Sequence, residues 1–67
     1  MAVRNRLKEI RMQEYMENGK EFCNRIGIPQ STYSPLEANK QQGTADTMFR
    51  IARALNKKIE EIWYWED

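Results

Sequence analysis

Few residues of this 67-residue chain could do covalent or metal chemistry. It contains no histidine and one cysteine, Cys23, so it lacks the ligands of a usual zinc site and cannot form an internal disulfide. It has no phosphate-cradling glycine loop, and no paired carboxylate motif beyond Glu60 and Glu61. The pattern predicts a protein that is not an enzyme, with no catalytic residue, cofactor or metal, in a reducing compartment.

The charged residues are segregated along the chain. The formal net charge is +1, but residues 1–58 hold all 11 Lys and Arg and six of the 10 acids, whereas residues 59–67 hold four acids and no base. A basic body with an acidic end is typical of a protein that places one face on phosphate and turns its C-terminus away. The alternative is chance clustering on a solvated surface.

Chain length and hydropathy predict one small domain in the cytoplasm. At 67 residues a single core is only marginally stable, which favours a tight helical bundle or a homodimer. No stretch approaches the roughly 20 apolar residues of a membrane span. The charged start MAVRNRLKEI also differs from the apolar segment of a signal peptide, so no membrane association is expected.

Two short helices are predicted in the first half of the chain. Apolar residues at roughly helical spacing indicate a first helix over residues 5–16. After a break at ENGK, Asn18 is a suitable N-cap for a second helix over residues 19–26, and Gly27 suits the left-handed position that ends a helix.

Two more helices are predicted in the second half. Thr44 can cap a helix over residues 45–56, whose apolar stripe at i, i+3, i+4 and i+7 consists of Met48, Ile51, Ala52 and Leu55. A last helix is expected over residues 59–67, an acidic, aromatic segment. No alternating run is long enough to indicate a strand. With a helical element near residues 30–38, the expected fold class is all-α, with five short helices.

The stretch EFCNRIGIPQSTYSPLE has two short helices joined by a tight glycine-containing turn, which is typical of a helix-turn-helix. With the following LEANKQQGTADTMFRIARALNKKIEEIW, the chain resembles the Xre and phage-repressor helix-turn-helix family of transcriptional regulators over about residues 5–63. Leu36, Glu37 and Lys40 stand where that family has LExGK. Its closing IAxALxxxxxEI pattern is matched by Ile51, Ala52, Leu55, Ile59 and Ile62. The resemblance implies a compact five-helix bundle, the lambda-repressor-like DNA-binding domain.

The resemblance also implies a set of residues that contact DNA. The start of the second helix and the loop after the third would bind phosphates, while the third helix would read base edges. Glutamine suits base reading because its amide donates and accepts in one plane, although Gln30 and Ser31 could instead be ordinary polar residues at a helix start. The family usually has a glutamine where this chain has Gly19, so one side-chain anchor is missing. The predicted set is Asn18, Gly19, Lys20, Gln30, Ser31, Thr32, Ser34, Pro35, Asn39, Lys40 and Gln41.

Pro35 conflicts with an ordinary third helix. In a helix that starts at Gln30, it removes the hydrogen bond to the Ser31 carbonyl and costs roughly 3 kcal/mol. SPLE is also a good helix start, with Ser34 as N-cap, proline at the first position and Glu37 completing a capping box. We therefore predict an irregular or 3₁₀-like turn over residues 30–34 and regular helix from near Ser34.

Three further features have two interpretations each. Glu37 and Arg11 stand where the family has an ion pair between its first and third helices, although Arg11 could instead contact phosphate. Cys23 is expected to pack in the core, with a redox role as the alternative. The terminal IWYWED is either a lid on the core, with Trp63 inward, or a homodimer patch formed by Tyr64 and Trp65; the patch is favoured.

Two functions remain in competition. The first is a transcriptional regulator, a repressor, that binds double-stranded DNA as a dimer on a palindromic operator. Such a short chain has no room for a ligand-sensing domain, so no small-molecule ligand is expected. The second is a protein-interaction module on the same fold, an antirepressor or accessory factor, which Pro35, Gly19 and the modest net charge favour.

Overall fold

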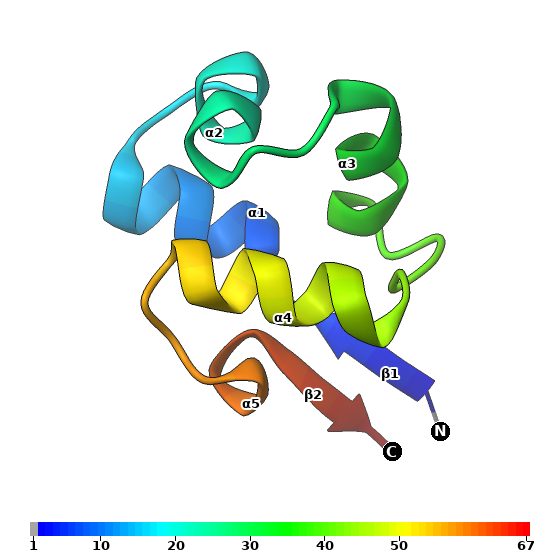
Figure 1. The fold of residues 1–67 in the computed structure, drawn as a ribbon. Coiled ribbons are helices and arrows are strands. Elements are labelled where there is room, and N and C mark those ends of the chain that lie inside the picture. Colours follow the sequence, from blue (N-terminus) through cyan, green and yellow to red (C-terminus); the bar gives the residue numbers. More distant parts are fainter. Residues whose placement is uncertain (1) are drawn as a thin grey trace.

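A computed structural model of the chain describes residues 2–67 as a helical body closed by a two-stranded ribbon (Figure 1). α2 and α3 lie at one end of the molecule, and the ribbon, with both termini, lies beyond α4 on the opposite side. The elements in chain order are β1 (Ala2–Asn5), α1 (Leu7–Ile10), the π-helical turn η1 (Arg11–Tyr15), α2 (Gly19–Ile26), α3 (Gln30–Glu37), α4 (Ala45–Ala54), α5 (Ile59–Ile62) and β2 (Trp63–Glu66). The expected all-α class with five helices is confirmed: the structure is mostly helical, and the two short strands do not change its class.

One apolar core is shared by all the helices. Its largest fully buried side chains come from α1, α2, α3, α4 and α5, namely Leu7, Phe22, Leu36, Ile51 and Ile62. The predicted stripe of α4 is buried at Ile51, Ala52 and Leu55, and Met48 packs partly buried against it. Trp63 is also buried, which fits the interpretation of IWYWED as a lid on the core, the less favoured of the two.

The caps predicted for α2 and α4 are present. The Asn18 side chain accepts a hydrogen bond from the Glu21 N–H at 2.8 Å, and the Glu21 carboxylate accepts one from the Asn18 N–H at 3.0 Å. Thr44 Oγ1 accepts from the Thr47 N–H at 3.2 Å. Gly27 ends α2 at φ 71°, a conformation that a side chain would disfavour. These helix ends follow from local residue chemistry, and the sequence predicted them correctly.

The first helix differs from its prediction at both ends. Asn5 belongs to β1, and regular helix begins only at Leu7. The last turn is wound more widely, as η1, and Met16 follows it in the left-handed region at φ 52°. The helix predicted over residues 5–16 therefore exists as α1 and η1 over a shorter span.

The prediction of helix over residues 59–67 is wrong beyond Ile62, and so is the absence of strands. β2 pairs antiparallel with β1, so that Asn5 faces Trp63 and Val3 faces Trp65. The Arg6 N–H also donates to the Ile62 carbonyl at 3.0 Å, where the chain leaves α5 for the ribbon. Tryptophan and tyrosine favour strands, but a strand needs a partner, and here the partner lies at the other end of the chain. The spacing of apolar residues within one segment carries no signal of that pairing.

The third helix also differs from its prediction, because α3 is regular from Gln30 and contains Pro35 in its interior. The Thr32 and Tyr33 amides donate to the Pro29 carbonyl at 3.0 and 2.9 Å, so the helix starts at Pro29 and not at Ser34. The shortened-helix prediction is wrong.

Burial explains why the intact helix is preferred. Tyr33 is 2% exposed and Leu36 is 1% exposed. Burial of a large apolar side chain contributes roughly 1.5–3 kcal/mol, so the pair outweighs or balances the roughly 3 kcal/mol cost of an interior proline. The Ser34 side chain is exposed and makes no cap, so it has no role as a helix start.

Replacement of Pro35 by alanine should stabilise the protein. Alanine restores the N–H that donates to the Ser31 carbonyl and removes a clash worth about 3 kcal/mol, while the freer unfolded chain offsets about 1 kcal/mol, which leaves a gain of about 2 kcal/mol. Ser34→Ala is the matched control and should change the free energy of unfolding by less than about 0.5 kcal/mol. Urea melts measure both. A neutral Pro35→Ala together with a loss of about 1 kcal/mol for Ser34→Ala would mean that the helix starts at Ser34 after all.

Candidate nucleic-acid interface

The N-terminus of α2 presents unpaired backbone donors. Asn18 satisfies the Glu21 amide, which leaves the amides of Gly19 and Lys20 at the first two helical positions without a helical acceptor. Such amides, with the helix dipole, attract phosphate. The Asn18 side chain is committed to its cap, and the Glu21 carboxylate lies at the same helix end, so the backbone amides and the Lys20 ammonium are the groups that favour an anion.

Gly19 and Gln30 lie next to each other, although eleven positions separate them. A Cβ placed on Gly19 would be 3.9 Å from the Gln30 side-chain nitrogen. The fold therefore brings the start of α2 and the start of α3 together, as two helices joined by a tight turn require. The Gln30 amide reaches the region where a longer residue at position 19 would place its own side chain.

α3 has one buried face and one polar face. Tyr33 and Leu36 point into the core, and Pro35 is half-buried. The exposed residues are all short or polar, namely Gln30, Ser31, Thr32 and Ser34. Of the predicted reading residues, these four share an accessible surface, whereas Pro35 offers no polar side-chain group and lies at its edge.

The loop after α3 is folded back onto the helix. Asn39 has φ 60°, the Lys40 amide donates to the Pro35 carbonyl at 3.0 Å, and the Asn39 amide donates to the Leu36 carbonyl at 3.0 Å. This is a Schellman motif, in which asparagine takes the left-handed position usually held by glycine. Its geometry leaves the side chains of Lys40 and Gln41 exposed beside the end of the helix.

A cluster of amides, formed by Asn5, Asn39 and Gln42, holds this loop from behind. Asn5 is 4% exposed, and its side-chain nitrogen donates to the Leu36 carbonyl at 2.8 Å and to Gln42 Oε1 at 2.7 Å. Asn39 Oδ1 accepts from the Asn5 N–H at 2.8 Å and from Gln42 Nε2 at 3.1 Å. The Asn39 side chain is thus turned inward, and its part in the site is to fix the loop.

The same cluster also reaches the start of α1. Asn5 Oδ1 accepts from the Leu7 N–H at 3.1 Å, so one side chain joins the start of α1, the end of α3 and the following loop. The roles of Asn5 and Gln42 were not predicted from the sequence. Asparagine two positions before the first apolar helical residue is a usable local signal, because its side chain can accept from the backbone two residues on. Gln42 has no local signal.

An ion pair fixes the orientation of α3 relative to η1. Arg11 Nε donates to Glu37 Oε1 at 2.7 Å, the Tyr33 hydroxyl donates to the same oxygen at 2.7 Å, and Arg11 Nη1 donates to the Glu17 carbonyl at 2.8 Å. The predicted pair of Arg11 and Glu37 is therefore present, and the Arg11 guanidinium is occupied within the protein. The alternative, Arg11 as a phosphate contact, is not supported, because the guanidinium already donates to Glu37 and to the Glu17 carbonyl.

The surroundings of Glu37, Tyr33 and Arg11 shift the pKa of each group. Burial raises the pKa of the Glu37 carboxyl, but the hydrogen bonds from Arg11 and Tyr33 and the charge of Arg11 outweigh it, so the pKa lies below its usual value. Burial, followed by the hydrogen bond to Glu37, raises the pKa of Tyr33, and the hydrogen bond to Glu37 raises that of Arg11. Carboxylate, phenol and guanidinium therefore coexist over the neutral range, in the forms that bind one another.

Cys23 belongs to the core and not to a reactive site. Its thiol is buried among the apolar side chains, and burial raises its pKa, which suppresses the nucleophilic thiolate. Packing is the role that this geometry supports.

Neither a cluster of metal ligands nor a membrane-spanning helix is found within residues 2–67. Across residues 2–67, no three side chains of His, Cys, Asp or Glu converge as metal ligands would. None of the helices in that span combines the length and apolar character needed to cross a bilayer.

The comparisons with known proteins agree with this geometry. The sequence model of a family described as "Helix-turn-helix" matches residues 7–62. A protein of Archaeoglobus fulgidus named as an uncharacterized HTH-type transcriptional regulator is 32% identical over 65 residues, which cover 97% of this chain and 90% of the relative. A second protein of that organism, with the same name, is 28% identical over 65 residues, 97% of this chain and 91% of its own length.

Removal of the Glu37 charge should change both stability and its dependence on pH. Glu37→Gln leaves the half-buried Arg11 without its anion and should cost about 2 kcal/mol at pH 7. Because the folded-state pKa of Glu37 is depressed, its contribution is complete above the unfolded pKa of about 4.3 and is lost as pH falls through the folded value. The difference between wild type and variant should therefore shrink from pH 5 towards pH 3.

Urea melts over that pH range provide the measurement, with Glu9→Gln as the control at an exposed carboxylate on α1. The control should keep the wild-type acid slope. A Glu37→Gln variant with the same stability difference at every pH would rule out the depressed pKa as the source of that stability.

Proposed function

This chain belongs to the Xre-like helix-turn-helix family of DNA-binding transcriptional regulators, and we propose that it is a repressor that binds a palindromic operator as a homodimer. The observation that carries the proposal is the polar face of α3, formed by Gln30, Ser31, Thr32 and Ser34 on a helix whose opposite face is buried. A helix of this kind, projecting beside the start of a second helix, suits the major groove.

Base reading is assigned to the first turn of α3. Because the helix is regular from Gln30, the N-terminal residues that enter a major groove first are Gln30 and Ser31. The Gln30 amide matches the donor and acceptor of adenine. Pro35 has no hydrogen-bonding side chain, so we assign to it only apolar contact at the edge of the site.

Phosphate contacts are assigned to the two segments beside α3. The amides of Gly19 and Lys20 and the Lys20 ammonium face one backbone, and Lys40 and Gln41 on the folded-back loop face another. Asn18 and Asn39, whose side chains are used internally, hold these segments in place. Such contacts supply affinity and register without sequence information.

The homodimer is proposed because a single short helix buries too little surface for specific affinity. Two copies related by a two-fold axis would read half-sites about 34 Å apart, and the molecule's extents of 31 × 22 × 19 Å fit that spacing. The contact is assigned to the C-terminal ribbon, where Trp65 is 60% exposed. Tyr64 contributes less, because its ring lies under the Arg6 guanidinium at 4.7 Å.

The remaining assignments follow from this function. We treat residues 1–67 as one DNA-binding domain without enzymatic activity or small-molecule ligand, acting in the cytoplasm where its DNA target is found. The interaction module without specific DNA binding is not favoured, because both relatives are named as transcriptional regulators.

Selection from a random duplex library at near-physiological salt tests the proposal. We expect enrichment of an inverted repeat whose half-sites lie about 34 Å apart, centre to centre. Enrichment of a single unrepeated half-site would contradict the proposed dimer. No enrichment at all would contradict sequence-specific DNA binding.

Two substitutions separate reading from anchoring on the selected duplex. Gln30→Ala should lose about 1–3 kcal/mol on the selected sequence and relax preference at one base pair of each half-site. Lys40→Ala should weaken binding to all duplexes alike and lower the slope of log affinity against log salt by about one unit per chain. Fluorescence anisotropy titrations at several salt concentrations measure both effects. A sequence-dependent loss for Lys40→Ala, or a uniform one for Gln30→Ala, would contradict these roles.

A further inference from the structure

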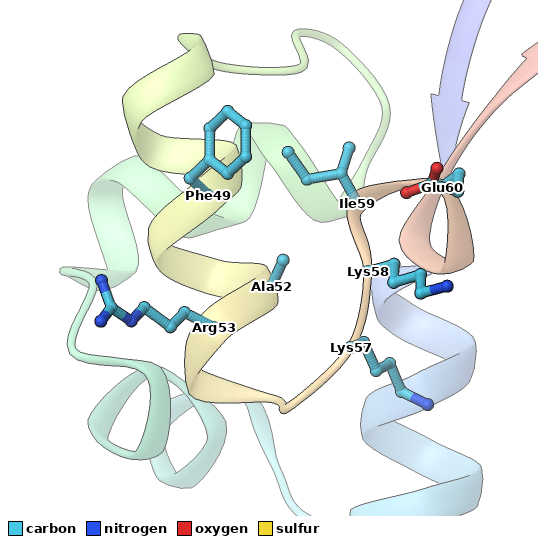
Figure 2. Close-up of a pocket in the computed structure, with 7 residues that line it drawn as sticks. All are labelled: Phe49, Ala52, Arg53, Lys57, Lys58, Ile59 and Glu60. Carbon is cyan, nitrogen blue, oxygen red and sulfur yellow. The ribbon is translucent and has the colours of Figure 1, made fainter.

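A hollow on the surface between α4 and the start of α5 is unused by the DNA-binding site. It has a volume of about 550 Å³, and its apolar floor is formed by Phe49, Ala52 and Ile59 (Figure 2). Phe49 and Ala52 on α4 face Ile59 across it, while the charged ends of Arg53 and Lys58 project outward on either side. Phe49 is 64% exposed, which is unusual for so large an apolar side chain.

The rim of the hollow is basic. Arg53, Lys57 and Lys58 line it, against one acid, Glu60. Lys57 is paired with Glu14 at 3.0 Å, but no ion pair within residues 2–67 engages Arg53 or Lys58. An apolar floor with two free cations at its margin selects an occupant that has an aromatic or aliphatic side chain next to carboxylates.

The same chain carries such a segment. Trp65 is exposed on β2 and is followed by Glu66 and Asp67, within a nine-residue end that has four acids and no base. We propose that the hollow beside Phe49 receives the C-terminal Trp65–Asp67 segment of a second copy of this chain. This proposal rests on the proposed homodimer and adds to it the surface that receives Trp65.

The positions of the two parts suit a two-fold contact. Ile59 and Glu60 in the hollow belong to α5, and β2 follows α5 directly, so the proposed receptor and insert belong to elements that are consecutive in the chain. An isologous interface requires both parts on one chain, because each copy must present both parts to the other. Self-insertion is excluded by the ribbon, since Trp65 is held opposite Val3 by strand pairing.

Opposite charge reversals test the contact. Arg53→Glu and Asp67→Lys should each weaken dimerisation at least about tenfold, because each places like charges across both copies of the contact. An equimolar mixture of the two variants should regain the dimer. In the mixed dimer, Glu at position 53 faces Lys at position 67 in one contact, and Arg53 faces Asp67 in the other. Sedimentation should give a mass near the single chain's 8.0 kDa for each variant and twice that for the mixture.

Arg50→Glu is the matched control, because Arg50 lies on α4 outside the hollow and pairs with Asp46 at 3.2 Å. It should sediment as the wild type does. Phe49→Ala and Trp65→Ala should each dissociate the dimer without loss of helical circular dichroism, because both side chains are exposed in one copy.

The outcomes distinguish this inference from the function on which it rests. Suppose that the wild type is a dimer and that Trp65→Ala dissociates it, whereas Phe49→Ala and Arg53→Glu leave it intact. The hollow is then not the surface that receives Trp65, although the homodimer stands. A variant mixture that stays monomeric, although each variant is folded, also overturns the proposed role of the hollow. If the wild type is monomeric both free and on its selected duplex, the proposed homodimer and the proposed role of the hollow are both wrong.

Discussion

The attachment of α3 to the core is the interaction on which the rest of the structure depends. Burial of Tyr33 and Leu36 holds the helix regular through Pro35, against a local preference of about 3 kcal/mol for ending it. Glu37 then fixes its rotation, since one carboxylate oxygen accepts from both Arg11 and Tyr33 at 2.7 Å. The polar face of α3 therefore has a defined direction, which the proposed reading of DNA by this helix requires.

The second constraint is the closure of the chain ends. Pairing of β1 with β2 places Asn5 opposite Trp63, beside the end of α3. From there its side chain binds the Leu36 carbonyl and Gln42, and its backbone binds Asn39. The ribbon that carries the exposed Trp65 is therefore hydrogen-bonded directly to the loop that presents Lys40. The proposed assembly through the ribbon and the proposed phosphate contact at Lys40 would therefore be linked through these hydrogen bonds.

The distribution of charge is consistent with this division of the molecule. Lys20 is the second residue of α2 and Lys40 follows α3, whereas the four acids of the last nine residues belong to α5, β2 and the residue after it. α5 and β2 lie on the other side of α4 from α2 and α3 (Figure 1). A duplex bound at α3, as proposed, would lie away from these four acids, which would repel it. The modest net charge of +1 does not reveal this separation, because it averages over the whole chain.

The sequence by itself determined the helical class, α2 and α4 with their caps, the core stripe of α4 and the pairing of Arg11 with Glu37. Caps and apolar periodicity act between residues within one or two turns, and the family motif supplied the pair. Three features were decided only by the tertiary structure: the intact α3, the terminal ribbon and the amide cluster around Asn5. The intact α3 depends on burial of Tyr33 and Leu36 in the shared core, and the other two features depend on groups 64 and 31 positions apart: Ala2 with Glu66, and Asn5 with Leu36. Burial and pairing energies at such separations override local preference, and no window of neighbouring residues contains them.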